Sequence, residues 1–118
     1  MREPTFLILT AIAAEPRHGY GIIREVKDLS GGRVSLAAGT LYAALDRLTD
    51  EGLIELDHEE TVNGRLRRYY RLSAAGASAL AIEADQLTAR AAAATARLAT
   101  RRIGIAGLIR ALIPAAMA

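Results

Sequence analysis

The chain has 118 residues, of which 52% are hydrophobic and 24% are charged, so it is long enough for one small domain with an extension and too apolar for global disorder. It contains no cysteine, which excludes disulfides, thiolate catalysis and cysteine-based zinc sites. The net charge is +2, but residues 1–72 hold ten basic and eleven acidic side chains, so nucleic-acid binding has to be argued from a local patch. Without a signal-peptide pattern or an apolar run near the roughly 20 residues that span a bilayer, we expect a soluble cytoplasmic protein.

Two helices are predicted near the start of the chain. The first covers residues 5–15, an apolar stretch without glycine that follows Pro4 and is stopped by Pro16. The second follows the glycines on either side of Tyr20 and ends at a Ser-Gly-Gly sequence. Its apolar stripe consists of four residues at helical spacing: Ile22, Ile23, Val26 and Leu29.

The third predicted helix runs from residue 39 to residue 51 and ends at Gly52. Three leucines recur at i, i+4 and i+7 and therefore face the core: Leu41, Leu45 and Leu48. This leaves Thr40 and Arg47 on one outward line, and Tyr42 with Asp46 on another.

A β-hairpin follows the third helix. Residues 53–60 alternate apolar and polar side chains, which predicts a strand with one wet face. Asn63 and Gly64 supply the preferred pair for a type I′ turn, in which both central residues need positive φ. Residues 65–72 form the return strand, with Leu66, Arg68, Tyr70 and Leu72 on one face and Arg65, Arg67, Tyr69 and Arg71 on the other.

A long alanine-rich helix is predicted over residues 77–102, with Ser73 as its cap and Gly76 as a slight weakness in its first turn. Its apolar seam alternates steps of four and three and has few intrachain partners, so it predicts a dimer interface of six residues: Leu80, Ala84, Leu87, Ala91, Ala94 and Leu98. Gly104 and Gly107 loosen a short apolar segment at residues 103–113, which either caps a partner subunit or frays. A weaker hypothesis makes residues 103–118 an interfacial membrane anchor.

Three helices followed by a hairpin are the order of a winged helix-turn-helix. Within these predicted elements, four stretches of the sequence resemble the PadR family of bacterial transcriptional regulators. They are Leu7 to Leu9 with Ile12; His18-Gly19-Tyr20; Gly39-Thr40-Leu41-Tyr42 with Ala44-Leu45, Leu48 and Glu51-Gly52-Leu53-Ile54; and Arg68-Tyr69-Tyr70-Arg71-Leu72-Ser73 with Gly76. Ser73 stands where the family usually has Thr, with the same capping chemistry.

The resemblance implies a mainly α fold with a small β-hairpin. It places a winged helix-turn-helix DNA-binding domain at residues 1–72, and a dimerisation helix with a short apolar tail at residues 73–118. It also implies a homodimer on double-stranded DNA, whose third helices enter successive major grooves of a palindromic operator while the wings lie on flanking backbone or minor groove. Family members are mostly repressors, several of them released by a small-molecule effector of phenolic or drug-like chemistry.

Seven residues are candidates for DNA contact: Ser35, Thr40, Tyr42, Arg47, Arg65, Arg67 and Arg68. Arginines beside a hairpin tip suit phosphate contact or a narrow minor groove, but they can also pair with the acidic residues of the other strand. Arg47 either reaches a base edge or phosphate, or pairs with Glu51 at i+4. Ser35 either contacts phosphate or caps a turn.

The hypothesis that the protein is an enzyme lacks support, because the sequence contains no phosphate-binding loop and no nucleophile elbow. His18 and His58 have no second ligand at metal spacing, so we expect neither a metal nor a cofactor. The leading alternative function is a winged-helix protein-interaction module that dimerises without binding DNA. The excess of one acidic residue over residues 1–72 keeps this alternative open.

Overall fold

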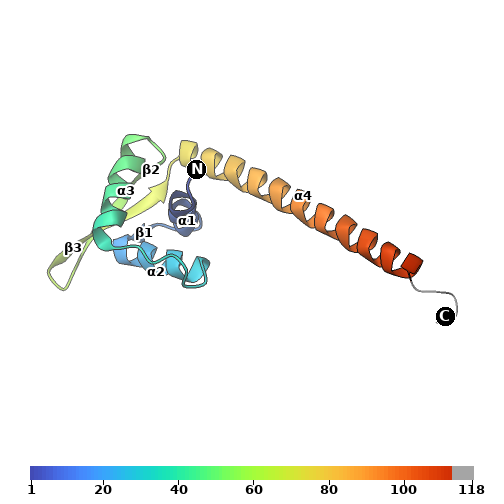
Figure 1. Ribbon diagram of the computed structural model, residues 1–118. Helices are drawn as coiled ribbons and strands as arrows, with labels where there is room; N and C mark the ends of the chain where they lie inside the picture. The colour runs from blue at the N-terminus through green and yellow to red at the C-terminus, as the bar shows by residue number, and fades with distance from the viewer. Residues whose placement is uncertain (113–118) are drawn as a thin grey trace. The chain divides into compact units, whose positions relative to one another are not determined.

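The computed structural model describes the backbone of residues 1–112 and the side chains of residues 1–102. Its elements are α1 (Glu3–Ala11), β1 (Arg17–His18), α2 (Gly19–Leu29), α3 (Ala38–Asp50), β2 (Ile54–Val62), β3 (Arg65–Leu72) and α4 (Ala74–Leu112) (Figure 1). The chain forms one compact unit over residues 1–83 and a second unit that begins at Ala84. The first unit has the predicted winged helix-turn-helix arrangement, while the domain boundary at residues 72 and 73 stays a prediction.

The hydrophobic core lies between α1, α2 and α3. Leu41, Leu45 and Leu48 of α3 are each at most 1% exposed, which confirms the face predicted from their spacing. They pack with residues of α1 and α2, with the residue that follows α1, and with the first residue of β2: Leu7, Ile8, Leu9, Ala11, Ile12, Ile22, Val26 and Ile54. Among the residues described, this core contains no buried polar or charged side chain.

The sheet has three antiparallel strands in the order β1-β3-β2, although only two were predicted. In the short additional strand, Arg17 pairs with Tyr70 and His18 with Tyr69. The Nε of Arg17 donates a hydrogen bond to the carbonyl oxygen of Ala11 at 2.8 Å, at the end of α1. The first helix ends at Ala11, so the predicted continuation to residue 15 is wrong.

Two apolar residues are exposed, although their spacing in the sequence predicted that they would be buried in the core. Leu29 is 45% exposed because it is the last residue of α2, beyond the buried cluster. Leu56 is also 45% exposed, next to a bulge where the pairing steps from Leu56–Tyr70 to His58–Tyr69. Asp57 is the extra residue at this bulge, so the regular alternation predicted for the strand ends there.

The start of α4 is tied to the loop before β2. The hydroxyl of Ser73 accepts a hydrogen bond from the Gly76 N–H at 3.0 Å, which confirms the predicted cap, and donates to the Gly52 carbonyl at 2.5 Å. Gly76 is buried, and a Cβ at this position would lie 1.8 Å from the carbonyl oxygen of Leu53. Gly76 is therefore required for close backbone approach, a role that the predicted slight weakening of the first turn did not include.

The helix α4 continues to Leu112, so its backbone passes through Gly104 and Gly107 where a separate, looser segment was expected. The side chains of residues 103–118, on which the capping and membrane-anchor hypotheses depend, lie outside the described residues. None of the helices in the described part of the chain carries an apolar stretch that could span a bilayer.

Replacing Gly76 with alanine is expected to lower the free energy of unfolding by at least about 2 kcal/mol, because the methyl group overlaps backbone that cannot rotate away. Gly39→Ala in α3 is the matched control, since a Cβ there meets open space. That control should leave stability unchanged or raise it by up to about 1 kcal/mol. Urea denaturation measures both, and equal stability of the two variants would contradict the close contact.

Candidate nucleic-acid interface

The β2–β3 hairpin forms the wing, which extends past the ends of α2 and α3 (Figure 1). Asn63 has φ 52° and Gly64 has φ 77°, so the turn has the two positive φ values that the Asn-Gly pair predicted. The return strand runs over the predicted residues 65–72, and Val62 pairs with Arg65 directly beside the turn. The wing tip therefore has a fixed register, and its arginines have defined neighbours.

The four arginines of β3 fall into two groups. Near the base of the wing, Arg71 binds Glu55 and Asp57, each at 3.0 Å. Arg68 lies 3.4 Å from a carboxylate oxygen of Glu59. These two residues adopt the cross-strand pairing that the sequence left open.

Arg65 and Arg67 make up the second group. Both are exposed, and neither forms an ion pair within residues 1–102, whose side chains are described. Two cations near the wing tip are therefore available to an anionic partner.

A groove of about 860 Å³ separates the wing from α3 and the start of α2. Tyr42 and Asp46 of α3 line one side, and Arg65, Arg67 and Arg68 of the wing line the other. Further lining residues are His18, Gly19, Tyr20, Val62, Asn63, Leu66 and Tyr70. Of the seven predicted DNA-contact residues, the structure thus brings four together around one groove.

Gly19 explains how Tyr42 reaches this position. A Cβ at Gly19 would lie 2.7 Å from the Tyr42 hydroxyl oxygen, so the phenol ring packs directly on the glycine at the start of α2. Asp46 and Tyr20 were not among the predicted interface residues. Asp46 could have been predicted from its i, i+4 spacing to Tyr42, because that spacing places both residues on one helix face.

The other three predicted residues do not line this groove. Arg47 donates to the Thr5 hydroxyl at 3.1 Å and lies 3.4 Å from Glu51, so it adopts the i+4 pairing and faces the start of α1. Thr40 and Ser35 are exposed, Thr40 in the first turn of α3 and Ser35 in the connector before it. Whether any of the seven residues contacts DNA stays a prediction.

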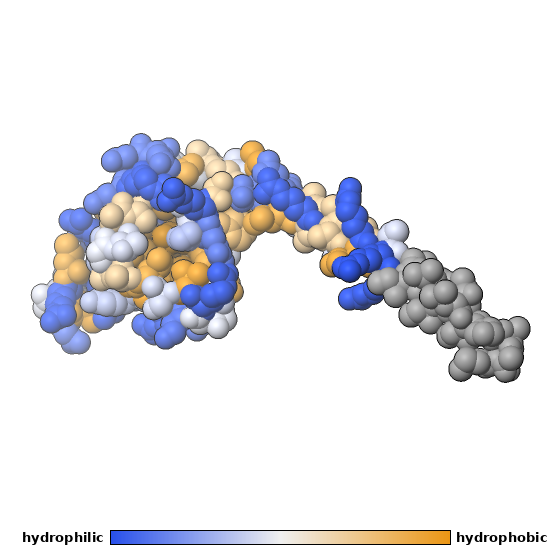
Figure 2. All heavy atoms as spheres, in the orientation of Figure 1, coloured by the Kyte–Doolittle hydropathy of each residue, from blue (hydrophilic) through white to orange (hydrophobic). Residues whose placement is uncertain are grey.

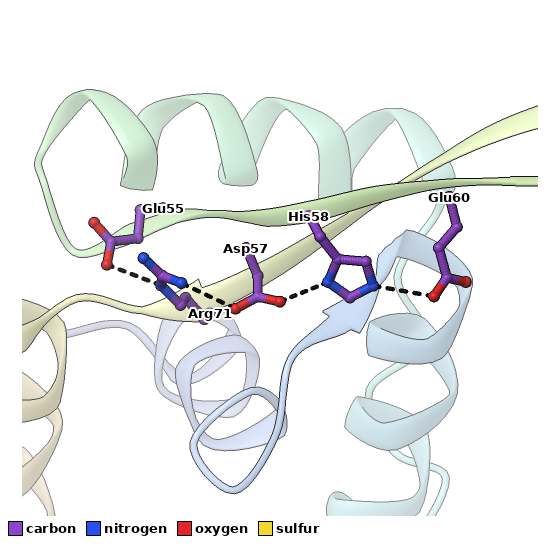
Figure 3. Close-up of polar contacts among 5 residues, drawn as sticks. All are labelled: Glu55, Asp57, His58, Glu60 and Arg71. Atoms are coloured by element: carbon purple, nitrogen blue, oxygen red, sulfur yellow. Dashed lines mark hydrogen bonds and ion pairs between the residues drawn. The ribbon is translucent and has the colours of Figure 1, made fainter.

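A row of polar contacts runs along one face of the wing, from Glu55 through Arg71, Asp57 and His58 to Glu60 (Figure 3). The Nδ1 of His58 lies 2.5 Å from an Asp57 oxygen, and its Nε2 lies 3.1 Å from an oxygen of Glu60. The imidazole also stacks on Tyr69, with ring centroids 4.3 Å apart and an angle of 14° between the planes. His58 is thus held on three sides.

These contacts shift the titration of the two histidines in opposite directions. The hydrogen bond to Asp57, followed by that to Glu60, raises the pKa of His58 above its ordinary value of 6.5. Partial burial lowers the pKa of His18, and the charges of Arg67 and Arg24 add to that effect. Within the described residues, no group of three His, Asp or Glu side chains lies close enough to hold a metal ion.

The predicted dimer seam differs in exposure along α4. Leu80 is half-buried and packs against the core of the first unit, and Ala84 is also half-buried. Leu87 is 40% exposed and Leu98 is 52% exposed, while Ala91 and Ala94 are exposed between them. Figure 2 shows uncovered hydrophobic atoms along this helix, interrupted by hydrophilic side chains.

Three helices, a two-stranded wing and a groove between the third helix and the wing define a winged helix-turn-helix protein. Residues 8–82 match the transcriptional regulator PadR-like family. The chain belongs to this family of transcriptional regulators, which confirms the resemblance seen in the sequence.

The transcriptional regulator Rv3488 of Mycobacterium tuberculosis is 41% identical over 73 residues, which are 62% of this chain and 64% of that protein. A PadR-like transcription factor from Bacteroides fragilis superimposes with a TM-score of 0.61 at 29% identity, covering 75% of this chain and 84% of that one. The Bacillus subtilis PadR in complex with operator DNA superimposes with a TM-score of 0.60 at 26% identity, covering 67% of this chain and 45% of that one. The chain spans less than two thirds of the length of the curated relatives it matches, down to 28% for the Escherichia coli regulator YqjI.

In an NMR titration, His58 is expected to protonate above pH 6.5 and His18 below it. Because the folded-state pKa of His58 is raised, its contribution to stability is fully present below pH 6.5 and is lost as the pH rises through the folded-state value.

Asp57→Asn removes the main cause of the raised pKa and should move the His58 pKa back toward 6.5. Asp46→Asn serves as the control, since Asp46 lies on α3 and does not contact His58. A His58 pKa that Asp57→Asn leaves unchanged would argue against the hydrogen bond.

Proposed function

We propose that this chain is a sequence-specific DNA-binding transcriptional regulator, which acts as a homodimer and represses transcription from a palindromic operator. The observation that carries the proposal is the pair of arginines, Arg65 and Arg67, that have no ion-pair partner within residues 1–102 and border the groove facing α3. The operator complex of the Bacillus subtilis relative supports this use of the fold.

The N-terminus of α3 offers a second phosphate contact. The residue before the helix is Ala37, and none of the side chains described caps this helix by a hydrogen bond. The first N–H groups of a helix lack intrahelical partners and attract anions, so a DNA phosphate at this end would be bound by backbone groups and by the Thr40 hydroxyl. Together with the wing arginines, these groups would offer phosphate donors on both sides of the α3 surface that would face base edges.

The dimer is supported by the uncovered apolar side chains of α4. Leu87 and Leu98 remain 40% and 52% exposed, and both belong to the predicted seam, whose steps of four and three residues form a heptad pattern. A palindromic operator needs two copies of α3 related by a twofold axis, and a self-complementary helix seam supplies such an axis. The alanines at intermediate positions allow close helix approach and bury less area per layer than leucines would.

Repression and release by a small-molecule effector rest on the family alone. Residues 73–118 contain no aromatic side chain, so an effector bound at the seam would be held by aliphatic contacts rather than by ring stacking.

Replacing Arg65 and Arg67 with alanine is expected to weaken DNA binding by about tenfold for the pair, because each loses a charge-assisted contact to phosphate. The slope of log affinity against log salt should flatten by about one unit per lost contact. The measurement is fluorescence anisotropy with a duplex from immediately upstream of the protein's own gene, at two salt concentrations.

Arg71→Ala is the control for this experiment. It is compared with Arg67→Ala alone, which removes the same single charge from the same strand, but Arg71 is already occupied by Glu55 and Asp57. Equal losses in Arg71→Ala and Arg67→Ala would show general charge attraction rather than a wing contact. Equal, weak binding of the upstream and a scrambled duplex by the unmodified chain would instead favour the protein-interaction module.

Leu87→Glu is expected to convert the dimer to a monomer, because it buries a charged side chain in the apolar seam at the position of Leu87. Ala92→Glu is the matched control, since five residues along a helix correspond to a rotation of about 140° and place the charge on the other side of α4. Sedimentation equilibrium distinguishes the two states. A Leu87→Glu variant that stays dimeric would mean that another surface forms the interface.

A further inference from the structure

Three glutamate–arginine pairs face each other across β2 and β3, and only two of them form ion pairs. The register pairs Glu55 with Arg71, Glu59 with Arg68, and Glu60 with Arg67. The first pair has an N–O distance of 3.0 Å and the second 3.4 Å, whereas the third forms no ion pair although both side chains are described. Directly opposite residues on one face are normally close enough to interact. Something therefore holds Glu60 away from Arg67.

His58 is the group that occupies Glu60. Its Nε2 lies 3.1 Å from Oε1 of Glu60, while its Nδ1 lies 2.5 Å from Asp57 (Figure 3). The stack on Tyr69, with ring centroids 4.3 Å apart, fixes the plane of the imidazole between the two carboxylates. Arg67 is left without a carboxylate partner within residues 1–102 because the histidine takes the one opposite it.

We propose that His58 is a positioning residue for DNA contact by Arg67: the protonated ring holds Glu60 and leaves Arg67 free for phosphate, and the neutral ring releases Glu60 to pair with Arg67. This inference rests on the proposed function, since it concerns how a wing arginine becomes available to DNA. It makes the DNA affinity of the wing rise as the pH falls through the titration of His58.

The hydrogen-bonding capacity of imidazole explains why His58, on losing its proton, releases Glu60 rather than Asp57. A protonated ring donates from both nitrogens, but a neutral ring donates from only one. Asp57 has the shorter contact and is also bound by Arg71 at 3.0 Å, so it keeps the remaining donor. Glu60 has no other ion-pair partner among the described side chains, and its neighbour in register is Arg67.

Among the groups around His58, His58 itself is the one whose charge changes over the pH range that concerns the inference. Asp57 and Glu60 face it from β2, and Tyr69, Arg67 and Arg71 lie along β3 on the same face. His18 of β1 contacts the same Tyr69 ring, with centroids 5.3 Å apart, and Arg24 of α2 acts on His18. The lowered pKa of His18 keeps it neutral over the range in which His58, with its raised pKa, loses its proton.

The test measures affinity for the upstream duplex by anisotropy between about pH 6 and about pH 8.5, across the range in which histidine titrates. The unmodified chain should lose about two- to fivefold in affinity over this range, the size expected of a competing exposed ion pair. His58→Phe keeps a ring on Tyr69 but cannot hold Glu60, so it should bind at the weaker level at all pH values. Glu60→Gln should bind at the stronger level at all pH values, and the double variant should recover that level.

Glu59→Gln is the matched control, because it removes the same charge from the neighbouring residue, whose partner is Arg68. It should keep the pH dependence of the unmodified chain. Retention of that dependence in His58→Phe or Glu60→Gln would overturn the inference while leaving the proposed function intact.

A chain that binds no DNA at any pH would overturn the proposed function instead, and the competition for Glu60 would still be measurable by NMR. Arg67→Ala should then raise the pKa of His58, because Glu60 loses its second partner, whereas Arg68→Ala on the opposite face should not. Equal His58 titration in the two variants would overturn the competition itself.

Discussion

Burial of one face of α3 is the constraint on which the rest of the first unit depends. Leu41, Leu45 and Leu48 are almost fully buried against α1 and α2, so the rotation of the helix about its axis is fixed. That rotation turns Tyr42 toward the wing and Arg47 toward the start of α1. The composition of the groove therefore follows from core packing, and a helix with the same residues in another rotation would present a different surface.

The bulge at Asp57 determines the chemistry of the wing in the same way. Arg67, Tyr69 and Arg71 alternate regularly and share one face of β3. Without an extra residue in β2, Glu55 and Glu60 would lie on opposite faces, because they are five positions apart. The bulge places both opposite this one face of β3, with Asp57 between Arg71 and His58. One inserted residue thus produces the polar row of five side chains.

The features that the sequence predicted well are those encoded within a few residues. The spacing of the leucines in α3, the Asn63-Gly64 turn and the Ser73 cap each depend on local geometry, and the structure confirms all three. The features it missed depend on contacts between distant residues. The two-residue strand β1 exists only because β3 offers an edge, and the need for Gly76 arises from the carbonyl of Leu53. Sequence could identify the arginines of the wing, but which of them would be occupied depended on the register set by the bulge.

The acidic excess of residues 1–72 is a poor guide to how this surface meets an anion, because charge acts locally. Glu55, Asp57 and Glu59 are bound by Arg71 or Arg68, so much of the negative charge of β2 is compensated at short range. Arg65 is six residues from Arg71, a separation of roughly 20 Å along a strand, which is about two and a half times the screening length at physiological salt. Carboxylates at the base of the wing therefore have little effect at its tip. Arg71 and Arg68 are held by carboxylates of β2, whereas Arg65 and Arg67 have no ion-pair partner among the described side chains, so the local partners of each arginine, rather than net charge, separate the two roles.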